Sequence, residues 1–265
     1  MLILYDGTTS VCGIKARVTL AEKGFDFESR NVDLRKGEQF APEYLKLNPN
    51  AVVPTLIDGE EIIVESSVII QYLDDIGTDG PSLLPKTPLD RAQMRLWLKR
   101  IDDPIHPATG TLTHATAFRP LFLKKSPEEQ KAHFEAMPDP ARRARQEAVY
   151  KDGLDAPIVA NAVRTFDQFV KDAETALTRN EYLAGPAYSL ADAAATPYIN
   201  RLDVLKLLSV WQTECPNVMG WYDRIRERPS FKSMITDYMT VEDVARFEAI
   251  DDSTADKARQ ILQQS

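Results

Sequence analysis

The sequence predicts an α/β domain with a mixed sheet, followed by an all-helical domain. Short apolar or alternating runs interleave with helical patterns in the order β-α-β-α-β-β-α at the start of the chain. A stretch dense in glycine and proline, Gly77 to Asp90, is typical of a linker. After it, apolar residues recur with the 3.6-residue period of amphipathic helices. We therefore expect a first domain over residues 1–77, a linker over 78–90 and a helical domain over 91–265.

Local patterns justify each element of the first domain. The apolar run LILY predicts a buried strand, and Gly24 is a typical stop signal for the helix that follows it. The dipeptide Asp58-Gly59 between two apolar runs is a strong hairpin signal. The expected elements are a strand over 2–5, a helix over 12–23, a strand over 25–33, a short helix over 38–49, a hairpin over 53–66 and a helix from Ser66 to Gly77.

The second domain is predicted to be helical throughout. Four segments show the helical period: residues 91–102, 156–177, 189–208 and 217–231. Ser189 and Asp192 fit the capping box at the start of the third segment. The polar, proline-punctuated stretch at about 119–153 is typical of an insertion or a long helix connection, and we expect it to cover the mouth of a pocket. The tail over 243–265 is weakly helical.

Composition and charge narrow the function classes. The chain has 265 residues, of which 43% are hydrophobic and 27% charged, as is typical of a soluble globular protein. With 32 basic against 40 acidic residues, its formal net charge of -8 argues against a nucleic-acid partner. No run approaches the ~18 apolar residues of a membrane span, and the chain opens without a secretory signal. We therefore expect a cytoplasmic protein without a membrane partner.

The cysteines and histidines predict neither a structural disulfide nor a metal site. Cys12 and Cys215 lie far apart in the sequence and form no CxxC pair. His106, His114 and His133 lack the spacing of metal ligands.

The junction of the first strand and the first helix, SVCGIKARV, carries the residues with the clearest chemical potential. A hydroxyl at a helix N-terminus stabilises a thiolate by a hydrogen bond and by the positive end of the helix dipole. Ser10 stands where that hydroxyl is needed, although spacing alone favours a capping role. Cys12 has two open readings, a nucleophile with a lowered pKa or a small buried apolar residue. The junction also holds further hydroxyls and cations: Thr8, Thr9, Lys15 and Arg17.

Three motifs give the chain a family resemblance. With AVVPTL before the hairpin, ESSVII at the start of the following helix and YSLADAAATP in the second domain, it resembles the cytosolic glutathione transferases over nearly its whole length. The resemblance implies a thioredoxin-like first domain that binds glutathione as co-substrate. It also implies a helical second domain that binds a small hydrophobic electrophile, and a homodimer.

Two branches of the family are similar to different halves of the chain. The SVCGIKAR turn resembles the zeta class and, more closely, the bacterial tetrachlorohydroquinone reductive dehalogenases. The second half, with RAQMRLWLKRID and SPEEQKAHFEAMPDPARRARQ, resembles the bacterial glutathione-dependent β-etherases that cleave lignin-derived aryl ethers. In the family, the serine at the place of Ser10 stabilises the glutathione thiolate. In the dehalogenases, the cysteine at the place of Cys12 attacks a glutathionyl adduct.

The resemblance also implies a set of glutathione-binding residues. Val53-Pro54 matches a cis-proline that leaves the Val53 backbone to pair with the cysteinyl portion, the alternative being a trans-proline at a strand start. Ser66 receives the γ-glutamyl carboxylate at a helix N-terminus and Glu65 the ammonium, although the pair alone is only a capping signal. Gln39 matches a zeta-class glutamine that reaches the glycyl end, and its alternative is a solvent-exposed residue.

For the electrophile's pocket the sequence says little. The family builds this pocket from the first turn, the first long helix of the second domain and the tail. The candidates are therefore Thr8, Trp97, Ile101, His106, His114 and Phe118. A lone histidine on a helix is more often structural or exposed than a substrate contact.

The sequence thus predicts a glutathione transferase whose Ser10 stabilises the thiolate for attack on an aromatic electrophile, in β-aryl ether cleavage or halide displacement. A second hypothesis is a glutathione-dependent reductive dehalogenase or thiol-disulfide enzyme that uses Cys12. A third is a non-catalytic glutathione-binding protein on the same fold. The intact set of Ser10, Val53-Pro54 and Glu65-Ser66 disfavours the third hypothesis.

Overall fold

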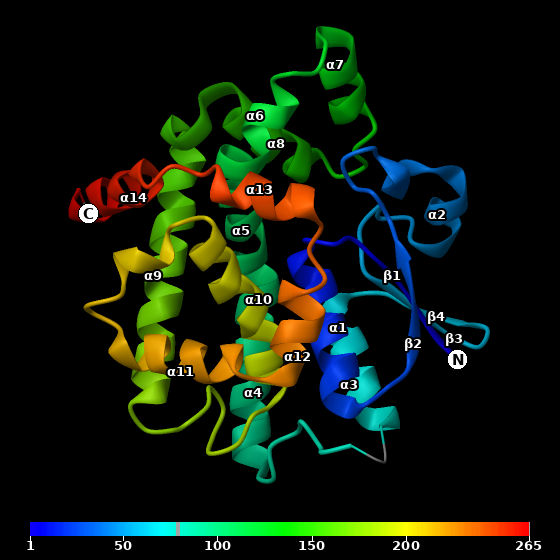
Figure 1. Ribbon diagram of the computed structural model, residues 1–265, viewed down its shortest axis with the longest axis vertical. Coiled ribbons are helices and arrows are strands. Elements are labelled where there is room, and N and C mark those ends of the chain that lie inside the picture. The colour runs from blue at the N-terminus through cyan, green and yellow to red at the C-terminus, as the bar shows by residue number, and fades with distance from the viewer. Residues whose placement is uncertain (78–79, 265) are drawn as a thin grey trace. The chain divides into compact units, whose positions relative to one another are not determined.

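The computed structural model describes residues 1–77 and 80–264, which Figure 1 traces from the N-terminus to the C-terminus. These residues form two compact units. The first unit comprises Met1–Lys99, Arg179–Pro197 and Trp221–Thr240, and the second comprises Arg100–Thr178, Tyr198–Gly220 and the chain from Val241 onward. The domain limits expected from the sequence divide the chain into consecutive segments instead, and they stay predictions. Residues 78 and 79 of the expected linker lie outside the described residues.

A four-stranded mixed sheet in the order β2-β1-β3-β4 lies in the first unit (Figure 1). Its strands are β1 (Leu2–Asp6), β2 (Phe27–Asn31), β3 (Thr55–Asp58) and β4 (Glu61–Ile63). β1 pairs in parallel with β2 and antiparallel with β3, which pairs antiparallel with β4. Gly59, at φ 62°, lies in the turn between β3 and β4, so the predicted hairpin is confirmed.

Helices cover both faces of this sheet. α1 (Val11–Lys23) and α3 (Ser66–Ile76) pack on one face, where Leu4, Leu20 and Leu73 share a buried core. α2 (Pro42–Leu47) follows a 3-10 helix, Glu38–Phe40, and packs on the other face, where Tyr44 meets Tyr5. Alternate residues of β1 thus point to opposite layers, as the pleat of a strand requires. The thioredoxin-like arrangement implied by the resemblance is confirmed.

The remaining regular elements among the described residues are helical, as the sequence predicts. The α-helices are α4 (Pro88–Arg100), α5 (His106–Thr113), α6 (Arg119–Phe122), α7 (Pro127–Glu135), α8 (Pro140–Asp152), α9 (Pro157–Leu177), α10 (Leu190–Val204), α11 (Pro216–Arg226), α12 (Pro229–Phe231), α13 (Val241–Glu248) and α14 (Ser253–Gln263). Short 3-10 helices span Gly153–Asp155 and Leu208–Val210. π-helical turns span Ile101–Ile105, His114–Phe118 and Lys232–Thr236.

The proline-punctuated stretch at 119–153 is helical rather than irregular. Pro127 and Pro140 stand at the first turn of α7 and α8, where the missing N–H of proline costs nothing. Ser126 forms a capping box with Glu129 at the start of α7, and Asp139 caps α8. The prolines therefore mark where helices begin.

The predicted pairing of Ser189 with Asp192 before α10 is confirmed, although Oγ of Ser189 accepts from the N–H of Ala191 rather than from that of Asp192. The backbone N–H and the hydroxyl of Ser189 both donate to Oδ2 of Asp192, at 2.9 Å each. Oδ1 of Asp192 accepts from the N–H of Leu183 and from Nε1 of Trp221, also at 2.9 Å. Burial raises the pKa of Asp192, against these hydrogen bonds, which act to lower it. One buried carboxylate thus joins the start of α10 to the backbone at Leu183 and to the side chain of Trp221.

Gly13 allows α1 to lie directly against the end of β1. A Cβ atom at this position would stand 1.5 Å from Oδ1 and 2.4 Å from Cγ of Asp6. The Asp6 carboxylate is itself buried and pairs with Arg17. Any side chain at Gly13 would therefore displace a buried ion pair.

We expect Gly13→Ala to lower the free energy of unfolding by about 2–4 kcal/mol, because disrupting a buried ion pair is strongly destabilising. Alanine in a helix interior otherwise stabilises by roughly 0.5–1 kcal/mol over glycine, so the expected sign is reversed here. Gly110→Ala in α5 is the matched control, since a Cβ there meets nothing within 4 Å. Urea unfolding of both variants checks the prediction, which a stabilised Gly13→Ala would contradict.

Candidate active site

Ser10 stands at the turn between β1 and α1 and caps the helix. Its Oγ accepts a hydrogen bond of 3.1 Å from the N–H of Gly13, and its own N–H donates to the Gly7 carbonyl at 2.9 Å. The capping role favoured by spacing is therefore confirmed. It uses the oxygen as acceptor, whereas stabilising a thiolate uses the hydroxyl proton as donor. The two roles predicted as alternatives are chemically compatible in one side chain.

Arg17 holds the backbone of this turn in place. Its fully buried guanidinium pairs with Asp6 and donates to the carbonyls of Thr8 at 3.0 Å and Gly7 at 3.4 Å. Burial lowers the pKa of Arg17 to about 10, so it remains charged at neutral pH. The positive potential expected from Arg17 is thus accompanied by a structural role in orienting the residues before Ser10.

The far side of Arg17 is closed by a segment late in the chain. Nε donates to the Met234 carbonyl at 3.1 Å, and the guanidinium carbon lies 3.8 Å from the ring centroid of Tyr238. The Tyr238 hydroxyl in turn bonds to Ser29 on β2. Asp6 and Tyr238 are two positioning residues that the sequence reasoning missed. Asp6 carries a signal, as the last strand residue before the turn, but Tyr238 carries none.

Cys12 is the second residue of α1 and is half-buried, so both readings of it stay open. It is not joined to Cys215 by a disulfide. Cys215 is buried, and burial raises the pKa of its thiol to about 11. Within the described part of the chain, no group of three or more His, Cys, Asp or Glu is placed to hold a metal ion. No described helix is long and apolar enough to cross a membrane.

The Val53-Pro54 peptide bond is cis, which confirms the geometry implied by the resemblance. Val53 lies outside the strand pairing, which starts with Thr55 opposite Tyr5. The Val52 carbonyl just before it accepts from the Tyr44 hydroxyl at 2.7 Å and from Nδ2 of Asn48 at 2.9 Å. The α2 segment therefore holds this backbone in position.

Glu65 and Ser66 form the start of α3. Glu65 is exposed, has a φ of 68° and does not cap the helix with its side chain. Such a conformation costs about 1–3 kcal/mol in a non-glycine residue, and strained residues of this kind cluster at binding sites. Ser66 is 7% exposed, and Ser67 beside it accepts from Nζ of the buried Lys15 at 2.8 Å. The N-terminus of α3 is thus set beside a cation, which favours an anion there.

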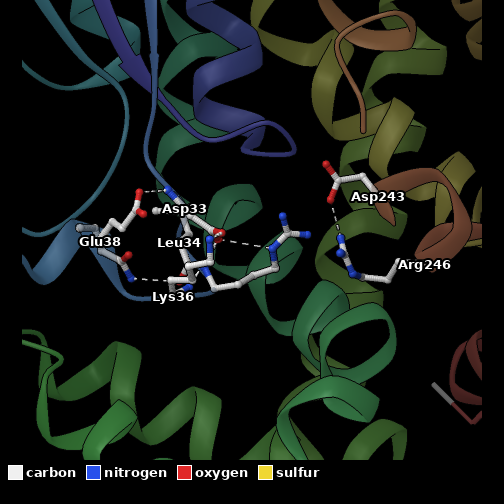
Figure 2. A network of polar contacts seen from close by, with 8 residues as sticks. Asp33, Leu34, Lys36, Glu38, Asp243 and Arg246 are labelled. Carbon is white, nitrogen blue, oxygen red and sulfur yellow. Dashed lines mark hydrogen bonds and ion pairs between the residues drawn. The ribbon is translucent and has the colours of Figure 1, made fainter. Parts of the chain in front are cut away.

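Gln39 is buried, so the alternative interpretation of this residue as solvent-exposed is wrong. It is 3% exposed, its Nε2 donates to the Leu34 carbonyl at 3.4 Å, and its Oε1 has no partner among the described residues. Figure 2 shows the loop before it, where the N–H of Asp33 donates to the Glu38 carboxylate at 2.7 Å. A buried amide oxygen without a partner is costly unless a ligand supplies a donor.

The candidates for the electrophile's pocket fall into different surroundings. In the first unit, Thr8 is half-buried, and Trp97 is 6% exposed with its N–H donating to Leu183. In the second unit, Ile101 is fully buried, while His106 is exposed and its Nδ1 lies 3.3 Å from the Tyr198 hydroxyl. The roles of these residues in a pocket stay predictions.

His114 and Phe118, two of the pocket candidates, are in contact, with ring centroids 5.2 Å apart. The amide of Gln146 donates to Nε2 of His114 at 3.2 Å, which leaves Nδ1 to donate to the Tyr150 hydroxyl oxygen at 2.6 Å. Burial lowers the pKa of His114 to about 3, and nearby cationic residues act in the same direction. His114 is therefore a neutral, fully hydrogen-bonded ring at neutral pH.

Comparison with known proteins reveals similarity along both halves of the chain. Residues 1–75 match the family description "Glutathione S-transferase, N-terminal domain", and residues 140–224 match "Glutathione S-transferase, C-terminal domain". Protein LigF from Sphingobium sp. (strain NBRC 103272 / SYK-6) is 32% identical over 238 residues, which cover 88% of this chain and 92% of that protein. Glutathione S-transferase F10 from Arabidopsis thaliana is 32% identical over 232 residues, covering 84% of this chain and 92% of that protein.

Two further relatives bear on the chemistry. The tetrachloro-p-hydroquinone reductive dehalogenase of Sphingobium chlorophenolicum is 28% identical over 238 residues, covering 87% of this chain and 94% of the dehalogenase. The crystal structure of the β-etherase LigF from Sphingobium sp. strain SYK-6 matches with a TM-score of 0.80 and 30% identity, covering 89% of this chain and 99% of that chain. Both branches that the sequence resembles are thus found among the similar proteins.

We expect the free energy of unfolding to fall as the pH falls from ~6.5 toward about 3, in part through His114. The folded protein binds a proton at His114 only at about pH 3, whereas an unfolded histidine does so at ~6.5, so the unfolded state binds more protons in this window. His114→Gln should flatten this slope by up to about 1.4 kcal/mol per pH unit. Urea unfolding at several pH values checks this.

His106→Gln is the control for this measurement, because His106 is exposed. Burial also lowers the pKa of His133. His133 therefore accounts for part of the pH dependence of stability that remains in His114→Gln. The same flattening in both variants would contradict the assignment to His114.

Proposed function

Because the chain belongs to the glutathione transferase family, we propose that it transfers the sulfur of glutathione to an electrophilic carbon of an aromatic substrate. The substrate class is a β-aryl ether or an aryl halide, the two chemistries named for its relatives LigF and the hydroquinone dehalogenase. The observation that carries the proposal is the hydroxyl of Ser10 at the N-terminus of α1, on a turn fixed by Arg17. By analogy with the family, we also propose a cytoplasmic homodimer.

The proposed binding roles follow the backbone geometry. The Val53 backbone pairs with the cysteinyl portion of glutathione as an added strand. Ser66 and the N–H groups at the start of α3 bind the γ-glutamyl carboxylate, and the exposed Glu65 binds the ammonium. The partnerless Oε1 of Gln39 accepts from an N–H donor near the glycyl end.

The proposed reaction is nucleophilic substitution at carbon. Ser10 donates a hydrogen bond to the thiolate, whose proton has gone to solvent, and thereby raises the fraction of the reactive anion. The thiolate sulfur forms a bond to the substrate carbon as the bond to the leaving group breaks. Phenolate or halide departs with the electron pair, and the product is a glutathione thioether.

A second candidate function uses Cys12 as well. It rests on the half-buried thiol at the second position of α1, two residues from Ser10. In this reaction Cys12 attacks the sulfur of a glutathionyl adduct and forms a mixed disulfide, while the released aryl carbanion takes a proton. A second glutathione then frees Cys12 and leaves as oxidised glutathione. Compared with substitution, the aromatic product is reduced and two glutathione molecules are oxidised.

Product analysis with an aryl ether and a halogenated hydroquinone separates the two functions. We expect Ser10→Ala to lower kcat/KM for thioether formation by about ten- to hundredfold, the worth of a hydrogen bond to a charged group. It should also move the thiolate limb of the pH–rate profile to higher pH. Cys12→Ser should leave thioether formation and abolish any oxidised glutathione.

The outcomes of this experiment are exclusive. Thioether without oxidised glutathione supports substitution, with Ser10 as the partner of the thiolate. Oxidised glutathione that rises in step with the dehalogenated product, and is lost in Cys12→Ser, supports the second function. Unchanged activity in Ser10→Ala would contradict the role of Ser10, and no product with either probe would favour a non-catalytic glutathione-binding protein.

A further inference from the structure

The cis Val53-Pro54 segment is supported by a buried hydrogen-bond network to which the proposed function assigns no role. We call this network the polar ring; it consists of the backbone carbonyl of Val52 and the side chains of Tyr44, Asn48 and Thr55. All of it lies within the first unit. The three residues that contribute side chains are buried. The polar groups of the ring therefore have to satisfy one another.

Each proton of the polar ring has a definite acceptor. The Tyr44 hydroxyl donates to the Val52 carbonyl at 2.7 Å. Because its single proton is then used, the 3.0 Å contact between the Tyr44 and Thr55 hydroxyls requires Thr55 to donate. Nδ2 of Asn48 donates to the Val52 carbonyl at 2.9 Å and to Oγ1 of Thr55 at 3.4 Å. Burial raises the pKa of Tyr44 to about 12, so the ring keeps all its protons at neutral pH.

The polar ring fixes the plane of the peptide bond between Val52 and Val53. This peptide bond is trans, unlike the one that follows it. In a planar trans peptide the C=O and N–H groups point in opposite directions. Since the Val52 carbonyl points toward two donors of the ring, the Val53 N–H points away from them. The direction of the Val53 donor therefore follows from the ring.

The backbone of Val53 has no partner of its own in this segment. Val53 is buried, and neither its N–H nor its carbonyl forms a hydrogen bond with a described residue. A buried backbone N–H without an acceptor is costly, and nearly all such groups in proteins are paired. A ligand that carries a carbonyl of the backbone type supplies the missing acceptor.

Asn48 also sets the course of the chain between α2 and Val53. Its Oδ1 accepts from the N–H of Asn50 at 3.1 Å, and its carbonyl accepts from the N–H of Ala51 at 3.0 Å. Ala51 is fully buried and has a φ of 53°, a strained conformation for a residue other than glycine. Such strain persists only where the surroundings determine the backbone, and Asn48 supplies two of the contacts that do so.

We propose that the polar ring directs the Val53 N–H toward the cysteinyl carbonyl of glutathione, with Tyr44, Asn48 and Thr55 as positioning residues. These residues act through the peptide plane of Val53 rather than by touching the ligand. The inference rests on the proposed function for the identity of the ligand. It adds what this part of the site selects, a thiol with a backbone-type carbonyl beside the carbon that bears the CH2–SH group. A thiol without that carbonyl gains nothing from the Val53 donor.

The test compares two ligands, S-methyl-γ-glutamylcysteinamide and S-methyl-γ-glutamylcysteamine, by calorimetric titration. Both keep the γ-glutamyl group and the sulfur, and methylation prevents them from reacting. The first has the cysteinyl carbonyl, and the second lacks it. The readout is the ratio of the two dissociation constants. We expect the protein to prefer the first ligand and Tyr44→Phe to reduce this preference by about three- to tenfold, the worth of a neutral hydrogen bond.

Tyr72→Phe is the matched control. The Tyr72 hydroxyl also donates to a residue of β3, at 2.7 Å to Oδ2 of Asp58, but Asp58 lies at the opposite end of the strand from Thr55. The preference between the two ligands should not change in this variant. Thr55→Val and Thr55→Ser form a second pair. Valine removes the donor to Tyr44 and should reduce the preference, whereas serine keeps the hydroxyl and should retain it.

A merely structural role of the polar ring gives different results. If Tyr44→Phe weakens binding of both ligands by the same factor, or if Tyr72→Phe reduces the preference as much, the proposal is overturned. If Tyr44→Phe does not fold, the Thr55 pair decides, and an equal preference in Thr55→Val and Thr55→Ser overturns the proposal.

The same measurements separate this proposal from the proposed function. Binding with the expected preference, in a protein that forms no thioether, supports the polar ring, and only the proposed function fails. Thioether formation by a protein that binds the two ligands equally well overturns the role of the ring and leaves the proposed function intact.

Discussion

The buried ion pair between Asp6 and Arg17 is the interaction on which the candidate active site depends. Asp6 ends β1 and Arg17 lies in the middle of α1, and both side chains are almost completely buried. Breaking such a pair by removing one partner costs about 3–5 kcal/mol. The remaining donors of Arg17 fix the carbonyls of Gly7 and Thr8. Strand, turn and helix N-terminus are therefore set by one charged contact, and the orientation of Ser10 follows from it.

The parts of the structure that the sequence predicted are those encoded over short distances. Only a few neighbouring residues are needed for three of these features: the hairpin at Asp58-Gly59, the pairing of Ser189 with Asp192 and the helix starting at Ser66. The contact from Arg17 to Met234 spans 217 residues, and no local pattern at either end announces it. Tyr238 was missed for the same reason, whereas Asp6, the last residue of β1 before the turn, carries a local signal.

Burial of polar groups was the least predictable property of the candidate site. Glutamine is a residue type usually found at the surface. Gln39 is nevertheless buried, and its Oε1 has no partner among the described residues. His114 was a candidate for substrate contact, yet Tyr150 and Gln146, both on α8, use its two ring nitrogens. Each outcome depends on which distant helix packs against the residue. That information is not present in the 3.6-residue period.

The partners of the buried cations in the first unit bear on the proposed chemistry. In the first unit, Lys15, Arg17 and Lys23 are buried and bonded to Ser67, Asp6 and Asp74, respectively. The proposed thiolate would therefore be stabilised by neutral donors, the Ser10 hydroxyl and the N-terminus of α1. The nucleophilicity of a thiolate falls as its pKa falls, so moderate stabilisation preserves reactivity better than a direct cation would.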